Sequence, residues 1–397
     1  MSHLRGASPS LIGVYCSTID GNSSIGICLE QLILQRLPSS LQRSLGTGFA
    51  EVVMEFLASG ASPSAIVGGW LRDLALGRDP GDVDLVSAQP DALKQRLLAA
   101  GARKAVLLDP MRRTWRVVLE RDVFVDVTLL QGLGSDPLVA DLGLRDLRVN
   151  ALAWNPLSGL LDPFSGLQDL NEGRLRAVSD RSMADDPLRA LRACRIAEQL
   201  GMQLAPELLR QMAGLSLQQV GRERCVAELR QILLQPFAAR PLRQLDELGL
   251  LAQQLPEPFD LQAYARVEGR QFTTAALKRC MEAVYAGGEA WRIGLRLSWL
   301  LSSERVDLKL RARRWPRRIA RLAGLGELRQ RRLVAELDAQ TLEQDLRRWK
   351  DAACVALLTS VRDLADEEAE QWVRAYLTVL GGRAMGGALT RQKGWEA

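Results

Sequence analysis

Two aspartates, Asp82 and Asp84, are separated by one residue in the segment DVDLV, which has the composition of a β-strand. Side chains alternate along a strand, so both carboxylates are expected on one face, with Val83 on the other. Mg²⁺ prefers a few carboxylate oxygens and fills its remaining positions with water and substrate phosphates. The pair therefore predicts a metal and phosphate site, although such a pair alone is also typical of a solvated strand edge.

Two adjacent glycines, Gly68 and Gly69, precede this strand and follow the apolar pair Ile66 and Val67. The local order predicts a strand, a glycine turn, a short helix that carries Arg72, a turn and a second strand. Glycine permits close approach of the backbone, and a helix start offers free N–H groups to a triphosphate. A plain structural turn is the alternative for the glycine pair.

A third carboxylate, Asp126, lies in the segment FVDVTLL and is expected on one strand face with Phe124 and Thr128. An acidic residue among apolar neighbours is costly unless it is paired or bound to a cation. Asp126 is therefore a candidate for the same site. The alternative is an aspartate on an edge strand that faces water.

The segment LRDLRVNALAW, from Leu144 to Trp154, contains Arg145, Asp146 and Asn150. On a helix, Asp146 and Asn150 are four residues apart and share a face. A carboxylate accepts hydrogen bonds and an amide both donates and accepts them, so this pair suits a clamp on ribose hydroxyls. A local hydrogen bond on a helix surface is the alternative.

The segment MADDPLRALRACRIAEQLG predicts a helix, with Asp185 or Asp186 as the N-cap and Gly201 as the stop. Asp186 and Arg189 can present a carboxylate and a guanidinium side by side. Cytosine and adenine both offer an exocyclic amine beside a ring acceptor, whereas uracil and guanine offer a carbonyl there. The pair therefore suits selection of C and A, and its alternative is a capping aspartate with a surface arginine. Arg192 continues the helical spacing.

Together these motifs resemble the class II tRNA nucleotidyltransferases and bacterial poly(A) polymerases, over roughly Phe56 to Leu234. The resemblance implies a polymerase-beta-like head in which Asp82, Asp84 and Asp126 are catalytic and hold two Mg²⁺ ions. It implies tRNA 3′ ends and CTP or ATP as partners. Leu144 departs from the family's Arg-Arg-Asp motif. The implied nucleotide-binding residues are Gly68, Gly69, Arg72, Arg145, Asp146, Asn150, Asp185, Asp186, Arg189 and Arg192.

The expected fold is an α+β head, a small mixed sheet with helices, followed by an all-α neck, body and tail. The predicted divisions are a disordered extension over residues 1–38, a head over 39–178, a neck over 179–240 and a body and tail over 241–397. Asp162 to Leu170 resembles the family's link between head and neck, and we interpret it mostly as a turn scaffold. Arg224 and Glu228 are predicted to brace the neck.

The composition is compatible with a polyanionic partner, because the 397 residues carry a net charge of +5 and the pI is 9.0. The most basic stretch runs from Leu310 to Arg332 and suits phosphate contacts and base stacking. A solvated basic helix face is the alternative. The candidate RNA-binding residues are Arg313, Arg314, Trp315, Arg317 and Arg318.

Several classes of function are disfavoured by composition. The six cysteines form no CxxC pair, which argues against zinc and against a disulfide framework and favours a cytoplasmic protein. The only histidine is His3, so a histidine mechanism is almost excluded. No window is apolar enough to cross a bilayer.

The product is left open by the sequence among CCA, CC, A alone and poly(A), and a noncatalytic RNA-binding relative is a further alternative. Only sixteen residues separate Thr128 from Arg145. In the family, a short loop at this place accompanies enzymes that stop after two cytidines. The sequence therefore favours a CC-adding enzyme.

Overall fold

The computed structural model describes residues 25–120, 122–132, 136–256, 258–268, 288–301 and 306–323. The protein divides into two compact units. The first comprises Met1–Arg189 with Leu200–Met212, and the second comprises Ala190–Gln199 with Ala213–Ala397. We describe each unit by itself.

A seven-stranded mixed sheet forms the centre of the first unit, with the strand order β3-β4-β5-β2-β1-β6-β7. β2 and β5 run parallel, and the other neighbouring strands are antiparallel. The strands are β1 (Ser64–Val67), β2 (Val83–Ser87), β3 (Lys104–Asp109), β4 (Thr114–Glu120), β5 (Val123–Leu129), β6 (Ala153–Asn155) and β7 (Gly159–Leu161).

The alternation of side chains along β5 explains how polar groups reach the middle of this sheet. Val125 and Val127 are fully buried on one face, whereas Phe124, Asp126 and Thr128 are only partly buried. β5 lies between β4 and β2, so Asp126 is not on an edge strand, and that alternative is wrong. The same strand thus supplies apolar packing on one side and a carboxylate on the other.

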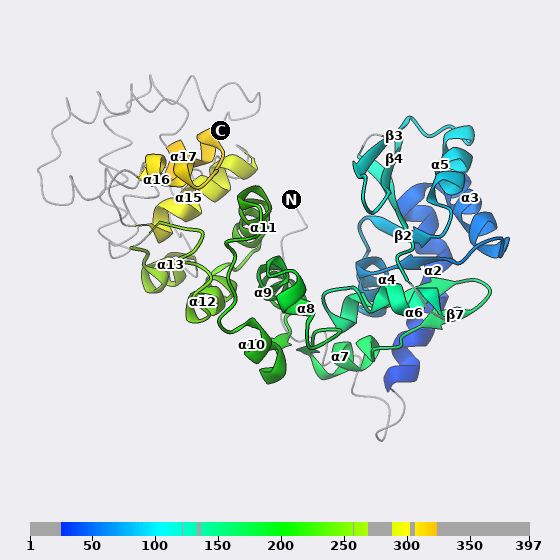
Figure 1. Ribbon diagram of the computed structural model, residues 1–397, viewed down its shortest axis with the longest axis horizontal. Coiled ribbons are helices and arrows are strands. Elements are labelled where there is room, and N and C mark those ends of the chain that lie inside the picture. Colours follow the sequence, from blue (N-terminus) through cyan, green and yellow to red (C-terminus); the bar gives the residue numbers. More distant parts are fainter. Residues whose placement is uncertain are drawn as a thin grey trace, which may run out of the picture. The chain divides into compact units, whose positions relative to one another are not determined.

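Helices pack around this sheet: α5 contacts β4 and β5, and α2 contacts β5 and α4 (Figure 1). A second small sheet pairs β8 (Arg174–Leu175) with β9 (Gln203–Leu204). The helices of this unit are α2 (Ile25–Leu45), α3 (Thr47–Ala58), α4 (Gly69–Ala75), α5 (Pro90–Ala99), α6 (Pro137–Leu142), α7 (Gly166–Glu172), α8 (Ser182–Asp185) and α10 (Pro206–Met212).

Two predictions about local structure are wrong. The extension expected over residues 1–38 does not continue that far, because Ile25–Leu45 forms α2, in which Ile33 and Leu37 are buried. The helix expected around Asp146 and Asn150 is instead a single 3₁₀ turn at Arg148–Asn150, followed by strand β6. A short apolar run does not distinguish a buried strand from a helix by periodicity, and here pairing with β1 decides.

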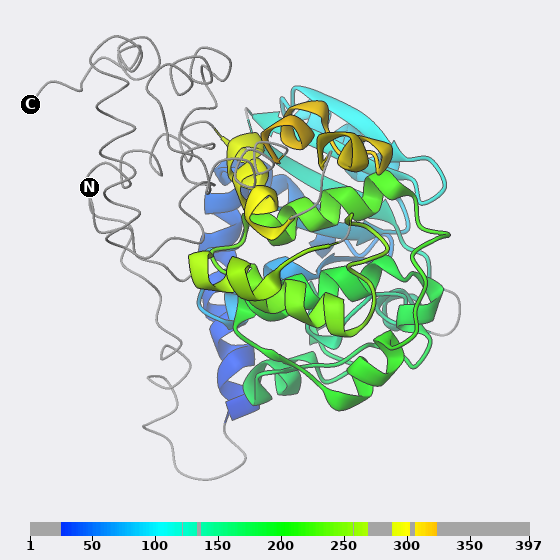
Figure 2. The ribbon, with the colours of Figure 1, turned by 90° about the vertical axis from the view of Figure 1, so that its left-hand side faces the viewer.

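The described part of the second unit is helical, as expected for the region after the head (Figure 2, green to orange). α9 (Leu188–Leu200) begins at the end of the first unit and contributes most of its length here. The other helices are α11 (Arg222–Leu234), α12 (Ala239–Glu247), α13 (Leu261–Glu268), α15 (Glu289–Leu300), α16 (Val306–Ala312) and α17 (Arg317–Ala323). Across the residues that the structure describes, no helix is both long and apolar enough to cross a membrane.

Candidate active site

The carboxylates of the DVD segment lie at the start of β2, beside the strand that carries Asp126. Asp84 pairs directly with Asp126 in the parallel β2–β5 register and with Val67 on the other side. Neighbouring strands are about 4.8 Å apart, so two carboxylates in register on one face are close neighbours. Asp82 immediately precedes β2 and is exposed, whereas Asp84 is partly buried. The structure therefore brings the three predicted carboxylates to one place.

The charges at this place oppose one another. The pKa of Asp84 is raised to about 6, first of all by burial. The charges of Asp126 and Asp82 also raise it, and Arg145 and Arg116 lower it. Burial also raises the pKa of Asp82, with Arg116 acting against the shift and Asp126 adding to it. A carboxylate that is desolvated and surrounded by like charge is stabilised by a nearby cation. The site is therefore short of positive charge at neutral pH.

Asp126 already has a cationic partner, which the sequence did not reveal. Arg116 of β4 lies opposite Asp126 in the register and donates through Nε (2.8 Å) and Nη2 (2.7 Å) to its two oxygens. The same guanidinium lies 3.8 Å from the ring centroid of Phe124. Arg116 could have been found by pairing β4 with β5 as a hairpin, because the two strands are consecutive in the sequence and separated by a short turn. The bidentate pair occupies the oxygens that a third metal ligand would offer.

The chemistry of the donor set fits a divalent cation at Asp82 and Asp84. In the described ranges of the sequence, no donor lies within hydrogen-bonding distance of the Asp84 carboxylate, so its lone pairs are available. No ready cluster of three or more His, Cys, Asp or Glu side chains that could hold a metal was found in those ranges. The ion pair between Arg116 and Asp126 explains why the three carboxylates do not form such a cluster, because it occupies both oxygens of Asp126.

Gly68 keeps the backbone close to this carboxylate. Its φ is +86°, and its N–H donates to the carbonyl of Leu152 (3.0 Å). A Cβ at this position would lie 3.0 Å from Nη1 of Arg145 and 3.9 Å from Oδ2 of Asp84. The backbone conformation therefore favours glycine, and the missing side chain leaves space between Arg145 and β2.

Arg72 lies below this surface rather than on it, because it is only 7 % exposed. Its Nη1 donates to Oδ1 of Asn150 (2.7 Å), and its Nη2 lies 2.8 Å from Oδ1 of Asp73. The guanidinium folds back towards Gly69, where an added Cβ would meet it at 3.2 Å. Arg72 therefore fixes helix α4 to the segment that carries Asn150.

Asp146 and Asn150 are brought together even though the expected helix is absent. Nδ2 of Asn150 donates to Oδ1 of Asp146 (3.0 Å), and that oxygen also accepts from the N–H of Leu147 (2.8 Å). Both side chains are 7 % exposed. Arg72, Asn150 and Asp146 thus form one continuous series of hydrogen bonds.

Asp186 caps α9 as the sequence predicts. α8 ends at Asp185, Asp186 is extended, and its Oδ1 accepts from the N–H of Leu188 (3.2 Å). Gly201, with φ +70°, follows the thirteen residues of α9. Asp185 is exposed and lies 3.7 Å from Nε of Arg181.

Arg189 is directed at the backbone of the Leu144 motif. Its Nη2 donates to the carbonyl of Leu144 (2.6 Å), and its Nη1 donates to Oγ of Ser182 (2.9 Å). Leu144 itself is 53 % exposed, so its side chain contributes no charge and little packing. The structure therefore joins the two nucleotide motifs through Arg189 and the main chain.

A brace and a stacking residue were expected in the helical region. Glu228 forms an ion pair with Arg195 (Nε to Oε1, 2.5 Å), which joins α11 to α9 as a brace would. The role of Arg224 stays a prediction. Trp315 is only 3 % exposed, so its predicted role in stacking on an RNA base is wrong for this conformation. Trp315 is packed in the hydrophobic interior and is therefore not part of the basic surface.

The remaining candidates in the tail stay predictions. Arg314, Arg317 and Arg318 are exposed and Arg313 is partly buried. The second basic run, residues 329–332, lies outside the described residues. Arg192 lies on the part of α9 that belongs to the second unit.

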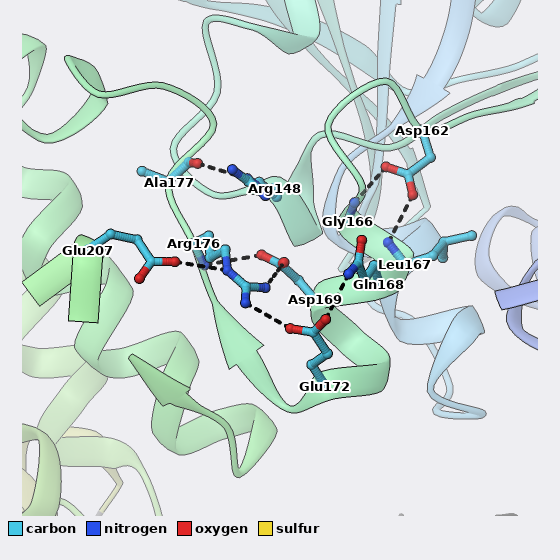
Figure 3. A network of polar contacts seen from close by, with 10 residues as sticks. All are labelled: Arg148, Asp162, Gly166, Leu167, Gln168, Asp169, Glu172, Arg176, Ala177 and Glu207. Carbon is cyan, nitrogen blue, oxygen red and sulfur yellow. Dashed lines mark hydrogen bonds and ion pairs between the residues drawn. The ribbon is translucent and has the colours of Figure 1, made fainter. Parts of the chain in front are cut away.

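A separate network of charges supports the segment after the site (Figure 3). The carboxylate of Asp162 accepts from the N–H groups of Gly166 (2.6 Å) and Leu167 (2.9 Å) at the start of α7, as a turn scaffold would. Arg176 donates to Asp169 (2.5 Å), Glu172 (2.8 Å) and Glu207 (2.9 Å), and Asp169 is fully buried. The carbonyl of Arg176 accepts from the N–H of Arg148 (3.0 Å). This network therefore holds the backbone next to the Asp146 motif.

Comparison with known proteins agrees with this geometry. Residues 64–176 match the poly(A) polymerase head domain, and residues 201–261 match the probable RNA and SrmB-binding site of polymerase A. A CC-adding tRNA nucleotidyltransferase of Deinococcus radiodurans is 32% identical over 264 residues, which cover 70% of that protein and 61% of this one. The chain belongs to the class II tRNA nucleotidyltransferase and poly(A) polymerase family.

Other relatives match over a shorter part. A CC-adding enzyme of Thermus thermophilus is 37% identical over 201 residues, and an A-adding enzyme of Deinococcus radiodurans is 37% identical over 203 residues. The chain spans less than half the length of these two relatives, 44% and 45% respectively. Among solved structures, a CCA-adding enzyme in complex with ATP has a TM-score of 0.71 at 21% identity, covering 93% of the present protein and 89% of that enzyme. That similarity shows the fold shared across the family.

Proposed function

We propose that this protein adds nucleotides from CTP or ATP to the 3′ end of tRNA without a nucleic-acid template. The observation that carries the proposal is the register of β2 and β5, which pairs Asp84 with Asp126 next to Asp82. Its relatives with CC-adding, A-adding and CCA-adding names support the same reaction class. The structures of CCA-adding enzymes with CTP and with ATP support these two triphosphates.

The metal is proposed to be Mg²⁺, held by Asp82 and Asp84 and supported by Asp126. Mg²⁺ supplies Lewis-acid activation of the attacking 3′-hydroxyl and neutralises charge on the leaving pyrophosphate when it is bound. The protein itself contributes position and fixed charge, so no protein nucleophile is needed. The pKa of Asp84, raised first by burial and then by the charges of Asp126 and Asp82, supports this assignment, because a bound cation would stabilise the ionised carboxylate.

The triphosphate is proposed to lie along Gly68, Gly69 and Arg145. Gly68 leaves room for a phosphate beside Asp84, and α4 begins at Gly69. Nε of Arg145 is buried, and no hydrogen-bond partner for it occurs within the described residues. A guanidinium with an unused donor beside a glycine turn suits an anionic ligand. Arg72 acts from below, by fixing α4.

The ribose is proposed to bind at Asp146 and Asn150, and the base at Asp186 and Arg189. The hydrogen bond between Asn150 and Asp146 holds an amide and a carboxylate side by side, a combination that suits ribose hydroxyls. Base selection at Asp186 and Arg189 requires that Arg189 exchange at least one of its backbone contacts for the base. Asp185 is assigned to the rim of the same site, and the predicted role of Arg192 stays a prediction.

The product is proposed to be CC rather than CCA. In the short segment between β5 and Arg145, helix α6 already takes up Pro137–Leu142, and Asp136 caps it by accepting from the N–H groups of Leu138 and Val139. Few residues are left for a long flexible loop. Poly(A) synthesis and a noncatalytic RNA-binding role are the competing functions, and the intact carboxylates favour catalysis over the latter.

The deciding experiment measures incorporation of labelled CTP or ATP, with Mg²⁺, into tRNA transcripts that end at the discriminator base, after one C and after CC. We expect two C residues and then arrest. Completion to CCA would overturn the CC assignment, and addition of A to the CC transcript alone would identify an A-adding enzyme. Extended A tails would indicate poly(A) synthesis. RNA binding without any Mg²⁺-dependent incorporation would refute the proposed reaction.

A further inference from the structure

The charge environment of Asp126 distinguishes it from the other two carboxylates of the site. Asp82 and Asp84 have no hydrogen-bond donor in the parts of the protein that the structure describes. Asp126 has two, because Arg116 meets both of its oxygens in a bidentate pair at 2.8 and 2.7 Å. Bidentate pairing between guanidinium and carboxylate is among the strongest charged contacts in proteins. Asp126, which is expected to contribute to the metal site, is thus already neutralised by Arg116.

The position of Arg116 is built into the sheet. It lies directly across from Asp126 in the β4–β5 register, so the pair does not depend on a flexible loop. Phe124, two residues before Asp126 on the same strand face, lies under the guanidinium at 3.8 Å. An aromatic face attracts a guanidinium and restricts its orientation. The cation is therefore retained at the site whether or not it holds the carboxylate.

The Arg116 side chain is nevertheless accessible to solvent. Its side chain is 36% exposed, whereas that of Asp126 is 16% exposed. Release of Asp126 leaves the guanidinium solvated and still over Phe124, so the loss of the pair is partly offset. Its charge also acts on Asp82 and Asp84, and any cation bound between these carboxylates is repelled by it.

We propose that Arg116 is a resident counter-ion that competes with the divalent cation for Asp126 and thereby weakens metal binding. The inference rests on the proposed metal site, and it assigns to Arg116 a positioning role and no direct part in the reaction. In the absence of metal the guanidinium neutralises Asp126. Metal binding at all three carboxylates requires the two hydrogen bonds from Arg116 to break.

The test is Mn²⁺ binding to the full-length protein without nucleotide, measured by the EPR signal of free Mn²⁺. Arg116→Gln removes the charge and the bidentate donor, and we expect binding about tenfold tighter, since the repulsion between a unit positive charge and the divalent ion is removed. Arg103→Gln is the matched control, because it removes the same charge from an exposed position just before β3. It should leave the affinity unchanged.

A double-mutant cycle locates the effect. Asp126→Asn should weaken Mn²⁺ binding much more in the Arg116→Gln background than in the native protein, because only there is Asp126 free to act as a ligand. Arg116→Lys retains the charge and is expected to give an affinity between those of the native protein and Arg116→Gln. Circular dichroism and thermal unfolding check that each variant is folded.

The outcomes separate this inference from the proposed function. If the native protein binds Mn²⁺, loses it in Asp84→Asn and shows no tightening in Arg116→Gln, the competition is refuted while the metal site stands. Equal tightening in Arg116→Gln and Arg103→Gln also refutes it, since the effect is then one of general charge. If neither the native protein nor Arg116→Gln binds Mn²⁺, both the competition and the metal site fail.

Discussion

Two clusters of carboxylates and arginine in the first unit differ in whether hydrogen-bond donors reach their carboxylates. In this sense the cluster around Arg176 is complete, and the cluster around Asp84 is incomplete. In the network of Figure 3, Arg176 donates to three acidic side chains, and the buried Asp169 also accepts from the N–H of Arg176 (3.1 Å). At the candidate active site, the carboxylate of Asp84 has no such donor among the described residues. Burial raises the pKa of both Asp84 and Asp169, but only at Asp169 do hydrogen bonds oppose the shift.

The difference shows how a structural carboxylate can be distinguished from one that is reserved for a ligand. A buried acid that serves the fold is surrounded by donors that satisfy its lone pairs. A buried acid that serves a ligand keeps them free, and the folded protein is less stable for it. Burial and a raised pKa alone do not separate the two, whereas the count of donors does.

The largest effect is expected for Asp84→Asn. It removes a charge that the proposed metal site depends on and should lower nucleotide incorporation by about 10³-fold or more, equivalent to several kcal/mol of transition-state stabilisation. Single-turnover incorporation into a tRNA transcript measures it. The variant should remain folded, and near-native incorporation would mean that Asp84 is not at the reacting centre.

The next largest effect concerns the complete cluster. Arg176→Met leaves Asp169 buried without its guanidinium and should reduce the free energy of unfolding of the first unit by about 3–5 kcal/mol. Denaturant unfolding measures the change. Arg174→Met is the matched control, because Arg174 is exposed on the same short strand and should cost little. A similar loss of unfolding free energy in both variants would show that the ion pairs of Arg176 do not stabilise the fold more than an exposed arginine does.

Substitution of Asp84 in the incomplete cluster should change the free energy of unfolding in the opposite direction, by increasing it at neutral pH. The pKa of Asp84 is raised from 3.8 to about 6, so the folded state binds the proton more tightly than the unfolded state. The stability of the native protein should then fall as pH rises from about 4 to 6, by about 2–3 kcal/mol. Asp84→Asn should be more stable than the native protein at pH 7 and should lose most of this pH dependence.

Asp91→Asn is the control for that measurement. Hydrogen bonding to Lys94 is the first cause that lowers the pKa of Asp91, so its carboxylate stabilises the folded state above its unfolded pKa. The substitution should act in the opposite direction and weakly, because Asp91 is partly exposed and screened by solvent. Unfolding midpoints of the three proteins between pH 4 and 7 test both signs. A native curve that rises over this interval would contradict the assignment to Asp84.

The smallest effect concerns the space beside the incomplete cluster. Gly68→Ala should cost about 1–3 kcal/mol of stability because φ is positive there. It should also raise the KM for the nucleotide, because the new methyl group would crowd Arg145. Gly101→Ala has a similar φ but open space around its Cβ, so it should lose stability without a change in KM. Equal KM values would place the triphosphate elsewhere.

Much of this fold could be predicted from local pattern. Alternation predicted the strand that is β5, and the Asp186 cap and the Gly201 stop predicted α9. Local pattern also gave the face that Asp126 shares with Phe124. These features depend on neighbours within a few residues, which is the range over which propensity and capping act.

What could not be predicted depends on pairing between distant segments. The Arg116 partner of Asp126 follows from the register of a local hairpin and could have been inferred, whereas the true conformation around Asn150 follows from the pairing of β6 with β1. The burial of Trp315 and the Arg195 partner of Glu228 follow from helix packing. None of these contacts leaves a periodic signal in the sequence, so the residue types were visible and their partners were not.

The order of strands in the sheet has a consequence for how the molecule acquires its site. Strands β3, β4 and β5 form an antiparallel meander of local contacts, and Arg116 and Asp126 both belong to it. Asp84 joins through the parallel pairing of β2 with β5, two strands that are separated in the sequence by α5, β3 and β4. Local hairpins form faster than long-range parallel pairs. We therefore expect Arg116 to pair with Asp126 during folding before Asp84 reaches the site. Pulse-labelling hydrogen exchange would show this order if the β5 amides that bond to β4 are protected before those that bond to β2.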